Sequence, residues 1–220
     1  MKNSFKKIYL SWRPSKGLSR LMVGEIIIHA EVINFRYIKE ELNKATKLGF
    51  SGYPGLPIDK PEHLASLDLF IKRLINTDRS DAEFLLNFWE IDSNYKEDKL
   101  YLLAMTQGIM QTDNFEFLAN FELKEGLTFV SDVAGLSHSK FDLTKVKIGS
   151  ELTFEKENHI KDKDAVKVLF KGELVGYIKK GHNQIFHEEG SLNIKIEVKH
   201  ITNTKVFKEL YVKIYSDSSK

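Results

Sequence analysis

Four polar side chains suited to ligand binding fall within eight residues of each other. The loop Lys156–Lys163 offers the amide of Asn158, the imidazole of His159, the carboxylate of Asp162 and the ammonium of Lys163. Amides and carboxylates can hydrogen-bond a base edge, and an ammonium can contact a phosphate. Because loops held by a rigid scaffold often carry binding groups, this loop is the first candidate for a functional site.

A second group of polar residues follows a short distance along the chain. Lys179 and Lys180 end an apolar run, and His182 opens a segment that we expect to be helical. Lysines beside a helix N-terminus can form an anion site. A charged turn followed by the start of a helix explains the same residues, and composition alone favours that simpler interpretation.

Patterns typical of metal sites and enzymes are absent from the sequence. The chain has seven histidines and no cysteine, and the closest histidine pair, His182 and His187, is five residues apart, which is poor helical spacing for shared ligands. No zincin, P-loop, dinucleotide-binding, esterase or kinase motif occurs. We therefore expect no metal, no cofactor and no catalysis. A nuclease or phosphoryl-transfer enzyme without a recognisable motif is the lower alternative.

Composition points to an ordinary globular protein. The chain has 220 residues, is 42% hydrophobic and carries a formal net charge of +2. The apolar run near the N-terminus is too short for a signal peptide or membrane span, so we expect a cytoplasmic location with no membrane contact. All five arginines precede residue 121, so any nucleic-acid contact of the later residues would use lysine as a point charge on phosphate.

The first part of the chain mixes the two periodicities of secondary structure. Alternation predicts strands, and helical spacing with capping signals predicts helices. An irregular loop with three glycines and two prolines, residues 49–59, interrupts them, and its Phe50, Tyr53 and Leu56 should pack onto a core. The expected strands are Lys7–Arg13, Leu21–Ala30, Val32–Tyr37 and Phe115–Phe121; the expected helices are Ile38–Leu48, Pro61–Asn76, Ser80–Trp89 and Asp98–Met105. These elements predict an α+β domain of antiparallel strands and about four helices over residues 1–123.

The rest of the chain is mainly strand. The runs Ala165–Phe170 and Leu174–Ile178 flank the turn Lys171-Gly172 and predict a hairpin. The other expected strands are Leu127–Gly135, Glu151–Glu155, Leu192–Ile201 and Val206–Tyr215; short helical turns are expected at Phe141–Val146 and His182–His187. Five or six short strands with one or two small helices predict an OB-like barrel over residues 124–220.

Five segments of this second part resemble the pattern of HIRAN domains. The segments are Val133-Ala134-Gly135, Gly149-Ser150-Glu151-Leu152, the Asn158…Asp162 loop, Asp164-Ala165-Val166-Lys167-Val168 and Val175-Gly176-Tyr177-Ile178. The resemblance implies an OB-like barrel. Because HIRAN domains of remodelling helicases capture single-stranded DNA 3′ ends, it also implies binding of DNA, as single strands or ends.

The segment after the first glycine departs from that pattern. DNA-end-binding members have an arginine and aromatics there, whereas this chain has Leu136-Ser137-His138. Without an arginine fork or stacking rings, the resemblance implies backbone contact through Lys163, Lys179 and Lys180. The predicted nucleic-acid-binding residues are therefore Asn158, His159, Asp162, Lys163, Lys179, Lys180 and His138.

The first part resembles the N-terminal subdomain of HipA-type toxin kinases. The similarity covers Phe50–Arg79 and Leu102–Phe117, where Gln107-Gly108 stands in for a Gly-Gly pair, and no kinase body follows. Stand-alone versions of that subdomain act as kinase partners in toxin–antitoxin systems. Taken together, the two resemblances predict a non-enzymatic bacterial module that joins a DNA-binding barrel to a protein-docking domain, in defence, toxin–antitoxin or DNA metabolism. The alternative is a protein-interaction module that regulates a separately encoded HipA-like kinase without binding DNA.

Overall fold

The chain forms two compact units. A computed structural model describes residues 5–15, 18–29, 32–64, 67–74, 76–77, 79–159, 162–189, 192–204 and 207–218. The first unit comprises Phe5–Asn87 and Ile91–Asn120. The second unit comprises Phe121–Lys220 and the short segment Phe88–Glu90, which lies within the residues 1–123 assigned to the first domain on sequence grounds.

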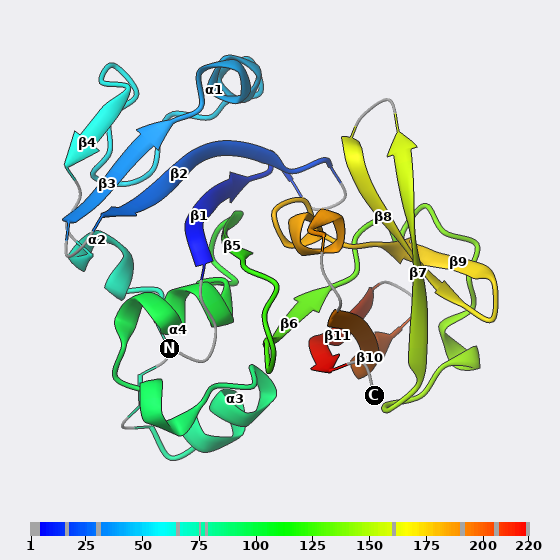
Figure 1. Ribbon diagram of the computed structural model, residues 1–220. Helices are drawn as coiled ribbons and strands as arrows, with labels where there is room; N and C mark the ends of the chain where they lie inside the picture. Colours follow the sequence, from blue (N-terminus) through cyan, green and yellow to red (C-terminus); the bar gives the residue numbers. More distant parts are fainter. Residues whose placement is uncertain are drawn as a thin grey trace. The chain divides into compact units, whose positions relative to one another are not determined.

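The first unit contains a five-stranded sheet with the order β4-β3-β2-β1-β5 (Figure 1). β1, β2, β3 and β4 pair antiparallel with their neighbours. The strands are β1 Phe5–Trp12, β2 Leu21–His29, β3 Val32–Tyr37, β4 Glu62–Leu64 and β5 Phe115–Phe121. The four longer strands match the sequence-based expectation, because their apolar residues alternate with period two.

Short helices and an irregular loop complete this unit. They are α1 Lys39–Thr46, α2 Asp68–Ile71, α3 Ala82–Phe88, η1 Ser93–Tyr95 and α4 Lys99–Thr106. Asp98 caps α4, since its carboxylate accepts the N–H groups of Leu100 and Tyr101. Phe50, Tyr53 and Leu56 are buried, so the expectation that the 49–59 loop packs onto a core is confirmed.

The expected helix Pro61–Asn76 is wrong. Glu62–Leu64 instead forms strand β4, which pairs with Asn34–Arg36 of β3, and helix is limited to Asp68–Ile71. The Tyr37 N–H donates to the Pro61 carbonyl at the start of this strand, 2.8 Å away. Pairing with an existing sheet therefore overrides the helical spacing of a short apolar run. Residues 65–66 and 75 of the expected helix lie outside the described residues.

One ion cluster in this sheet makes the unit's stability depend on pH. Burial alone would raise the pKa of Glu25, but hydrogen bonds from Lys7 and Arg36 outweigh it and hold that pKa below its usual value. A carboxyl with a depressed folded-state pKa stabilises the fold above its unfolded pKa, and this stabilisation is lost as pH falls through the folded value. We expect Glu25→Gln to lower the melting temperature at pH 7, and we expect this deficit to shrink as the pH falls below the usual glutamate pKa of about 4.3. Thermal unfolding followed by circular dichroism between pH 2.5 and pH 7 measures this; a deficit that is independent of pH would contradict it.

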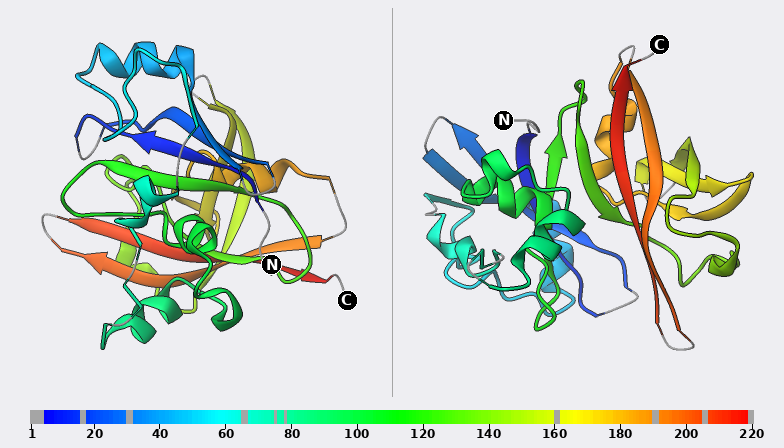
Figure 2. Two further views of the ribbon diagram at one scale, coloured as in Figure 1. Left: turned by 90° about the vertical axis from the view of Figure 1, so that its left-hand side faces the viewer. Right: turned by 90° about the horizontal axis from the view of Figure 1, so that it is seen from below.

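The second unit is a six-stranded sheet with the order β6-β11-β10-β7-β8-β9. The strands are β6 Thr128–Asp132, β7 Glu151–His159, β8 Asp162–Phe170, β9 Glu173–Tyr177, β10 Leu192–Asn203 and β11 Lys208–Ser218; two 3₁₀ turns, η2 Leu143–Lys145 and η3 His182–His187, lie between them. All pairings along the sheet are antiparallel. β10 and β11 form a long hairpin (Figure 2).

The two edges of this sheet meet. Just beyond β6, the Ala134 N–H donates to the Tyr177 carbonyl at 2.8 Å, and the Tyr177 N–H donates back to the Ala134 carbonyl at 2.9 Å. This bridge joins β6 to β9, the first strand of the order to the last. The mainly β layout expected from the sequence is therefore confirmed, and the sheet closes on itself as a barrel-like structure.

The predicted hairpin is confirmed. Phe170 pairs with Glu173, and the two residues between them, Lys171 and Gly172, have φ of 49° and 81°. Positive φ at both central residues defines a type I′ turn, the geometry that suits a two-residue connection between twisted strands. This hairpin fixes the position of Tyr177, the last residue of β9, and of Lys180, which follows it.

The core of the second unit is built from alternate residues of its strands. Ile196 and Val198 on β10 and Leu210, Val212 and Ile214 on β11 are all 1% exposed or less. A second part of the core stacks Phe121 on Phe129, with ring centroids 4.3 Å apart, and places the buried His182 ring 5.0 Å from Phe129. His182 Nδ1 lies 2.9 Å from the Ser131 hydroxyl, so this imidazole is a structural group of the core.

Candidate nucleic-acid interface

The seam between β6 and β9 brings together two of the sequence segments singled out above. Val133-Ala134-Gly135 meets Val175-Gly176-Tyr177 through the paired hydrogen bonds of Ala134 and Tyr177. The approach is close: a Cβ at Gly176 would lie 2.5 Å from the Ala134 carbonyl oxygen and 2.5 Å from a Val133 methyl carbon. Only glycine fits at position 176, so the close contact between the two segments explains why the second one has a glycine there.

Tyr177 is the aromatic side chain at this seam. Its ring lies beside exposed Gly135, where an added Cβ would be 3.5 Å from Tyr177 Cδ2, and Gly135 has φ of 79°. The Tyr177 hydroxyl donates to Glu157 at 3.1 Å, and Lys167 pairs with the same carboxylate at 2.8 Å. Burial raises the pKa of Tyr177, as does the hydrogen bond to Glu157, so the phenol stays protonated near neutral pH. A half-buried ring with a fixed hydroxyl beside bare backbone is a surface on which a planar base can stack.

Four of the predicted site residues are exposed. Asn158 lies near the end of β7 and Lys163 near the start of β8, while Lys180 follows the end of β9 and His138 follows Gly135. Because β7, β8 and β9 are antiparallel neighbours, the first three lie at the same end of the sheet. His138 belongs to the turn in which its N–H donates to the Gly135 carbonyl at 2.9 Å.

Asp162 has a structural role in the hairpin. Its carboxylate accepts the Asp164 N–H at 3.1 Å, and the fully buried Asn183 of η3 donates to the Asp164 carbonyl at 2.7 Å. His187 also lies 3.0 Å from that carbonyl. Asp162 therefore orients the start of β8 against η3.

The prediction that Lys179 contacts a ligand is wrong for this structure. Its side chain is completely buried and forms an ion pair with Asp132, so a phosphate cannot reach it. The residues at the start of η3 fit the simpler interpretation, a charged turn followed by the start of a helix, better than an anion site. His182 is buried, and the Gly181 N–H already donates to the Asn183 side chain at 2.9 Å. Of this second group of residues, Lys180 alone is exposed.

The predicted loop is shorter than expected. β7 runs to His159 and β8 begins at Asp162, so most of Lys156–Lys163 is strand. His159 pairs with Asp162 across the hairpin. The side chain of His159 and residues 160–161 lie outside the described part of the chain. The sequence did not predict these strand ends, because the last residues of β7 and the first residues of β8 are polar and lack apolar alternation.

Charge around the seam is mixed. Exposed or half-buried carboxylates, Glu157, Asp162 and Asp164, lie among Lys163, Lys167 and Lys180. Lys167 is held by Glu157, whereas Lys156, Lys163 and Lys180 are exposed among the described residues at this end. The surface is therefore suited to one or two phosphate contacts beside a stacked base.

Three residues of the candidate interface were missed by the sequence reasoning: Glu157, Lys167 and Tyr177. The signal for Tyr177 was present, since the Val175-Gly176-Tyr177-Ile178 segment had been singled out. Cross-strand neighbours connect the other two to it: Lys167 pairs with Tyr177, and Glu155, two residues before Glu157, pairs with Lys167. Such neighbours depend on register, which the sequence does not specify when polar residues border the hairpin.

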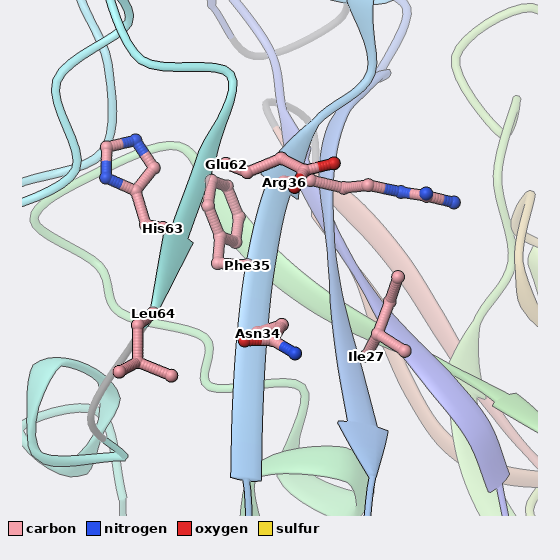
Figure 3. A pocket seen from close by; sticks show the side chains of 7 residues that line it. All are labelled: Ile27, Asn34, Phe35, Arg36, Glu62, His63 and Leu64. Carbon is pink, nitrogen blue, oxygen red and sulfur yellow. The ribbon is translucent and has the colours of Figure 1, made fainter.

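A pocket in the first unit is a weaker candidate. It has a volume of about 260 Å³ and is lined by Ile27, Asn34, Phe35, Arg36, Glu62, His63 and Leu64 (Figure 3). Its main polar groups already have partners: Arg36 donates to Glu25, and His63 Nε2 lies 3.0 Å from the Pro57 carbonyl. Nothing in this lining selects a ligand.

The described residues contain no group of three or more histidine, aspartate or glutamate side chains placed to hold a metal ion. Among the same residues, no helix has the length and hydropathy required to cross a bilayer.

Comparison with known proteins finds similarity to a solved structure. No protein-family model matches the chain, and no curated protein matches it in sequence. The chain is similar to the crystal structure of the HIRAN domain of human HLTF, with a TM-score of 0.32 and 16% identity over 40% of this chain and 74% of that one.

Proposed function

We propose that the second unit is a nucleic-acid-binding module with an OB-like barrel of the HIRAN type, and that its ligand is single-stranded DNA or a DNA end. The protein acts by binding and not by catalysis. The observation that carries the proposal is the seam: two segments of the HIRAN-like pattern meet there and hold the Tyr177 ring against exposed Gly135.

The geometry of the seam supports a stacking site with few ionic contacts. Tyr177 supplies a ring for one base, and Lys163 and Lys180 supply charges for one or two phosphates. Binding should therefore weaken with salt, but with a log–log slope of only about −1.4 for two phosphate contacts with a single strand.

Replacing Tyr177 with alanine should weaken DNA binding by about 5- to 150-fold, because one aromatic–base stack contributes about 1–3 kcal/mol. Tyr177→Phe keeps the ring and should retain most of the affinity. Fluorescence anisotropy of labelled single-stranded, blunt and 3′-recessed oligonucleotides at low salt measures both effects. Equal affinity of wild type and Tyr177→Ala would contradict the proposed stacking site.

Lysine charge at the seam is tested by a matched pair of variants on one hairpin. Lys180 follows β9 and Lys171 lies in the β8–β9 turn at the opposite end, and both are exposed. Lys180→Glu should reduce affinity and flatten the salt dependence, whereas Lys171→Glu should change neither.

A second candidate function is protein docking by the first unit, with a separately encoded HipA-like kinase as the partner that the sequence resemblance implies. Leu64 and Phe84 favour it, because these large apolar side chains are 82% and 72% exposed. Co-purification with such a kinase, and its loss in Leu64→Asp or Phe84→Asp, tests this function. If the wild-type chain does not co-purify with the kinase, the function is contradicted.

A further inference from the structure

The outer face of β10 and β11 carries rings and cations side by side. Alternate residues of the two strands point into the core, so their neighbours Tyr211, Lys213 and Tyr215 on β11 face outward. His200 pairs with Tyr211, and Lys213 lies over the Tyr215 ring with its Nζ 5.6 Å from the centroid. Aromatic rings for bases and ammonium groups for phosphates are what sequence-tolerant single-strand surfaces combine.

The segment Phe88–Glu90 of the same unit covers this face. Phe88 and Trp89 both meet the Tyr211 ring edge-on, with centroids 5.3 and 6.0 Å apart. The Phe88 ring also lies 6.1 Å from His200. The two rings of the segment therefore occupy the positions at which bases would contact Tyr211.

The carboxylate of Glu90 lies on this face where a phosphate of a nucleic acid would meet two lysines. Lys199 and Lys213 both donate to it, Lys213 at 2.9 Å. Burial would raise the pKa of Glu90, but the hydrogen bonds from the two lysines outweigh burial and lower it, so the group is charged at neutral pH. Two ammonium groups thus converge on one anion position.

The backbone of Glu90 has the left-handed conformation that glycine adopts without strain. Glu90 has φ of 56°, and the Ile91 N–H donates to the Leu86 carbonyl at 2.9 Å, which closes the end of α3. Glycine is the usual residue at such a left-handed helix end, because a side chain there costs about 1 kcal/mol. The turn therefore does not account for a glutamate at position 90, whereas the hydrogen bonds of its carboxylate with Lys199 and Lys213 do.

We propose that the outer face of β10 and β11 is a second contact surface for single-stranded nucleic acid, and that Phe88–Glu90 is an intramolecular competitor that covers it. The inference rests on the proposed function, since it assumes that nucleic acid is the ligand of this unit. Two rings followed by a carboxylate reproduce the chemistry of two bases and a phosphate. Lys195 is held by Asp217 at 2.9 Å, and Glu197 pairs in register with Lys213, so the uncovered face offers one phosphate position.

Glu90→Gln in the full chain tests the competitor. The variant removes the anion and keeps the size of the side chain, so the segment should release the face more often. Because apparent affinity scales with the fraction of molecules in the open state, we expect oligothymidylate to bind about 10-fold more tightly. The log–log salt slope should steepen by about 0.7, because Lys199 and Lys213 become available to one phosphate of a single strand. Wild-type affinity and slope in Glu90→Gln would overturn the proposal.

Two further variants make the result specific. Glu173→Gln is the matched control, because it removes a carboxylate that pairs with Lys145 at 2.6 Å elsewhere on the unit, and it should not alter binding. Lys199→Gln/Lys213→Gln in the Glu90→Gln background should abolish the gain; a gain that survives would overturn the proposal. Melting temperatures confirm that each variant is folded.

Failure of the inference is distinguishable from failure of the proposed function. If Tyr177→Ala weakens wild-type binding while Glu90→Gln changes nothing, the seam is the binding site and the second surface is refuted. If Glu90→Gln gains binding that needs Lys199 and Lys213 but not Tyr177, the second surface is supported and the seam is refuted. If no variant binds any oligonucleotide, both are refuted.

Discussion

Replacing Gly176 with alanine is expected to destabilise the second unit by about 3 kcal/mol, at the upper end of the usual cost of overpacking. The added Cβ would lie 2.5 Å from the Ala134 carbonyl oxygen, and backbone cannot move aside as a flexible side chain can. The strand after β6 would have to separate from β9, with loss of the two hydrogen bonds between Ala134 and Tyr177. Urea unfolding followed by circular dichroism measures the change.

Gly126→Ala is the control for this prediction. Gly126 has φ of 72° and nothing within 4 Å of an added Cβ, so its replacement measures backbone strain alone, about 1 kcal/mol. If Gly176→Ala costs no more than Gly126→Ala, the sheet is not closed at this seam. Because the seam also positions Tyr177, Gly176→Ala should weaken DNA binding even at temperatures where the variant remains folded.

Replacing Asp132 with alanine should cost about 3–5 kcal/mol, the range found when one partner of a buried ion pair is removed. Lys179 is fully buried and would lose the carboxylate that balances its charge. The expected observation is a large fall in the urea midpoint of the second unit. Lys179→Met together with Asp132→Leu should recover most of the loss, because apolar side chains of similar volume replace both charges.

Glu173→Ala provides the comparison for an exposed pair. Lys145 and Glu173 are about half exposed, so removal of this carboxylate should leave the urea midpoint nearly unchanged. A small effect of Asp132→Ala, similar to that of Glu173→Ala, would show that Lys179 reaches solvent, and Lys179 would return to the candidate interface.

Periodicity predicted the elements whose burial is regular. Phe115–Phe121 was predicted with the bounds of β5, and the Lys171-Gly172 turn was predicted from its glycine and the β-rich runs beside it. His182–His187 was predicted as a short helix and forms η3, although its first residue faces the core. In each case local preference and tertiary packing agree.

Sequence reasoning failed where tertiary contacts decide. Glu62–Leu64 is a strand because β3 offers an unpaired edge, which no local pattern reveals. Lys179 looked like a surface residue because lysine is rarely buried, yet Asp132, forty-seven residues earlier in the chain, balances its charge inside the unit. Tyr177 was quoted as part of a motif but was assigned no role, because its partners Glu157 and Lys167 depend on strand register.

The candidate interface is accordingly narrower than the sequence suggested. Asn158, Lys163, Lys180 and His138 are exposed and stay as predicted contacts, whereas Asp162 orients the hairpin and Lys179 is buried. The centre of the interface moves from the polar loop to the seam beside it. The HipA-like docking role of the first unit and its biological setting stay predictions from sequence resemblance.

Titration of the isotope-labelled chain with a short single-stranded oligonucleotide, followed by backbone amide NMR, tests the central claim most directly. We expect the largest changes in chemical shift on Gly135, Tyr177 and Lys180, with smaller changes on Tyr211 and Lys213 while Glu90 covers that face. Shift changes confined to the first unit, or no changes at millimolar oligonucleotide, would contradict the account.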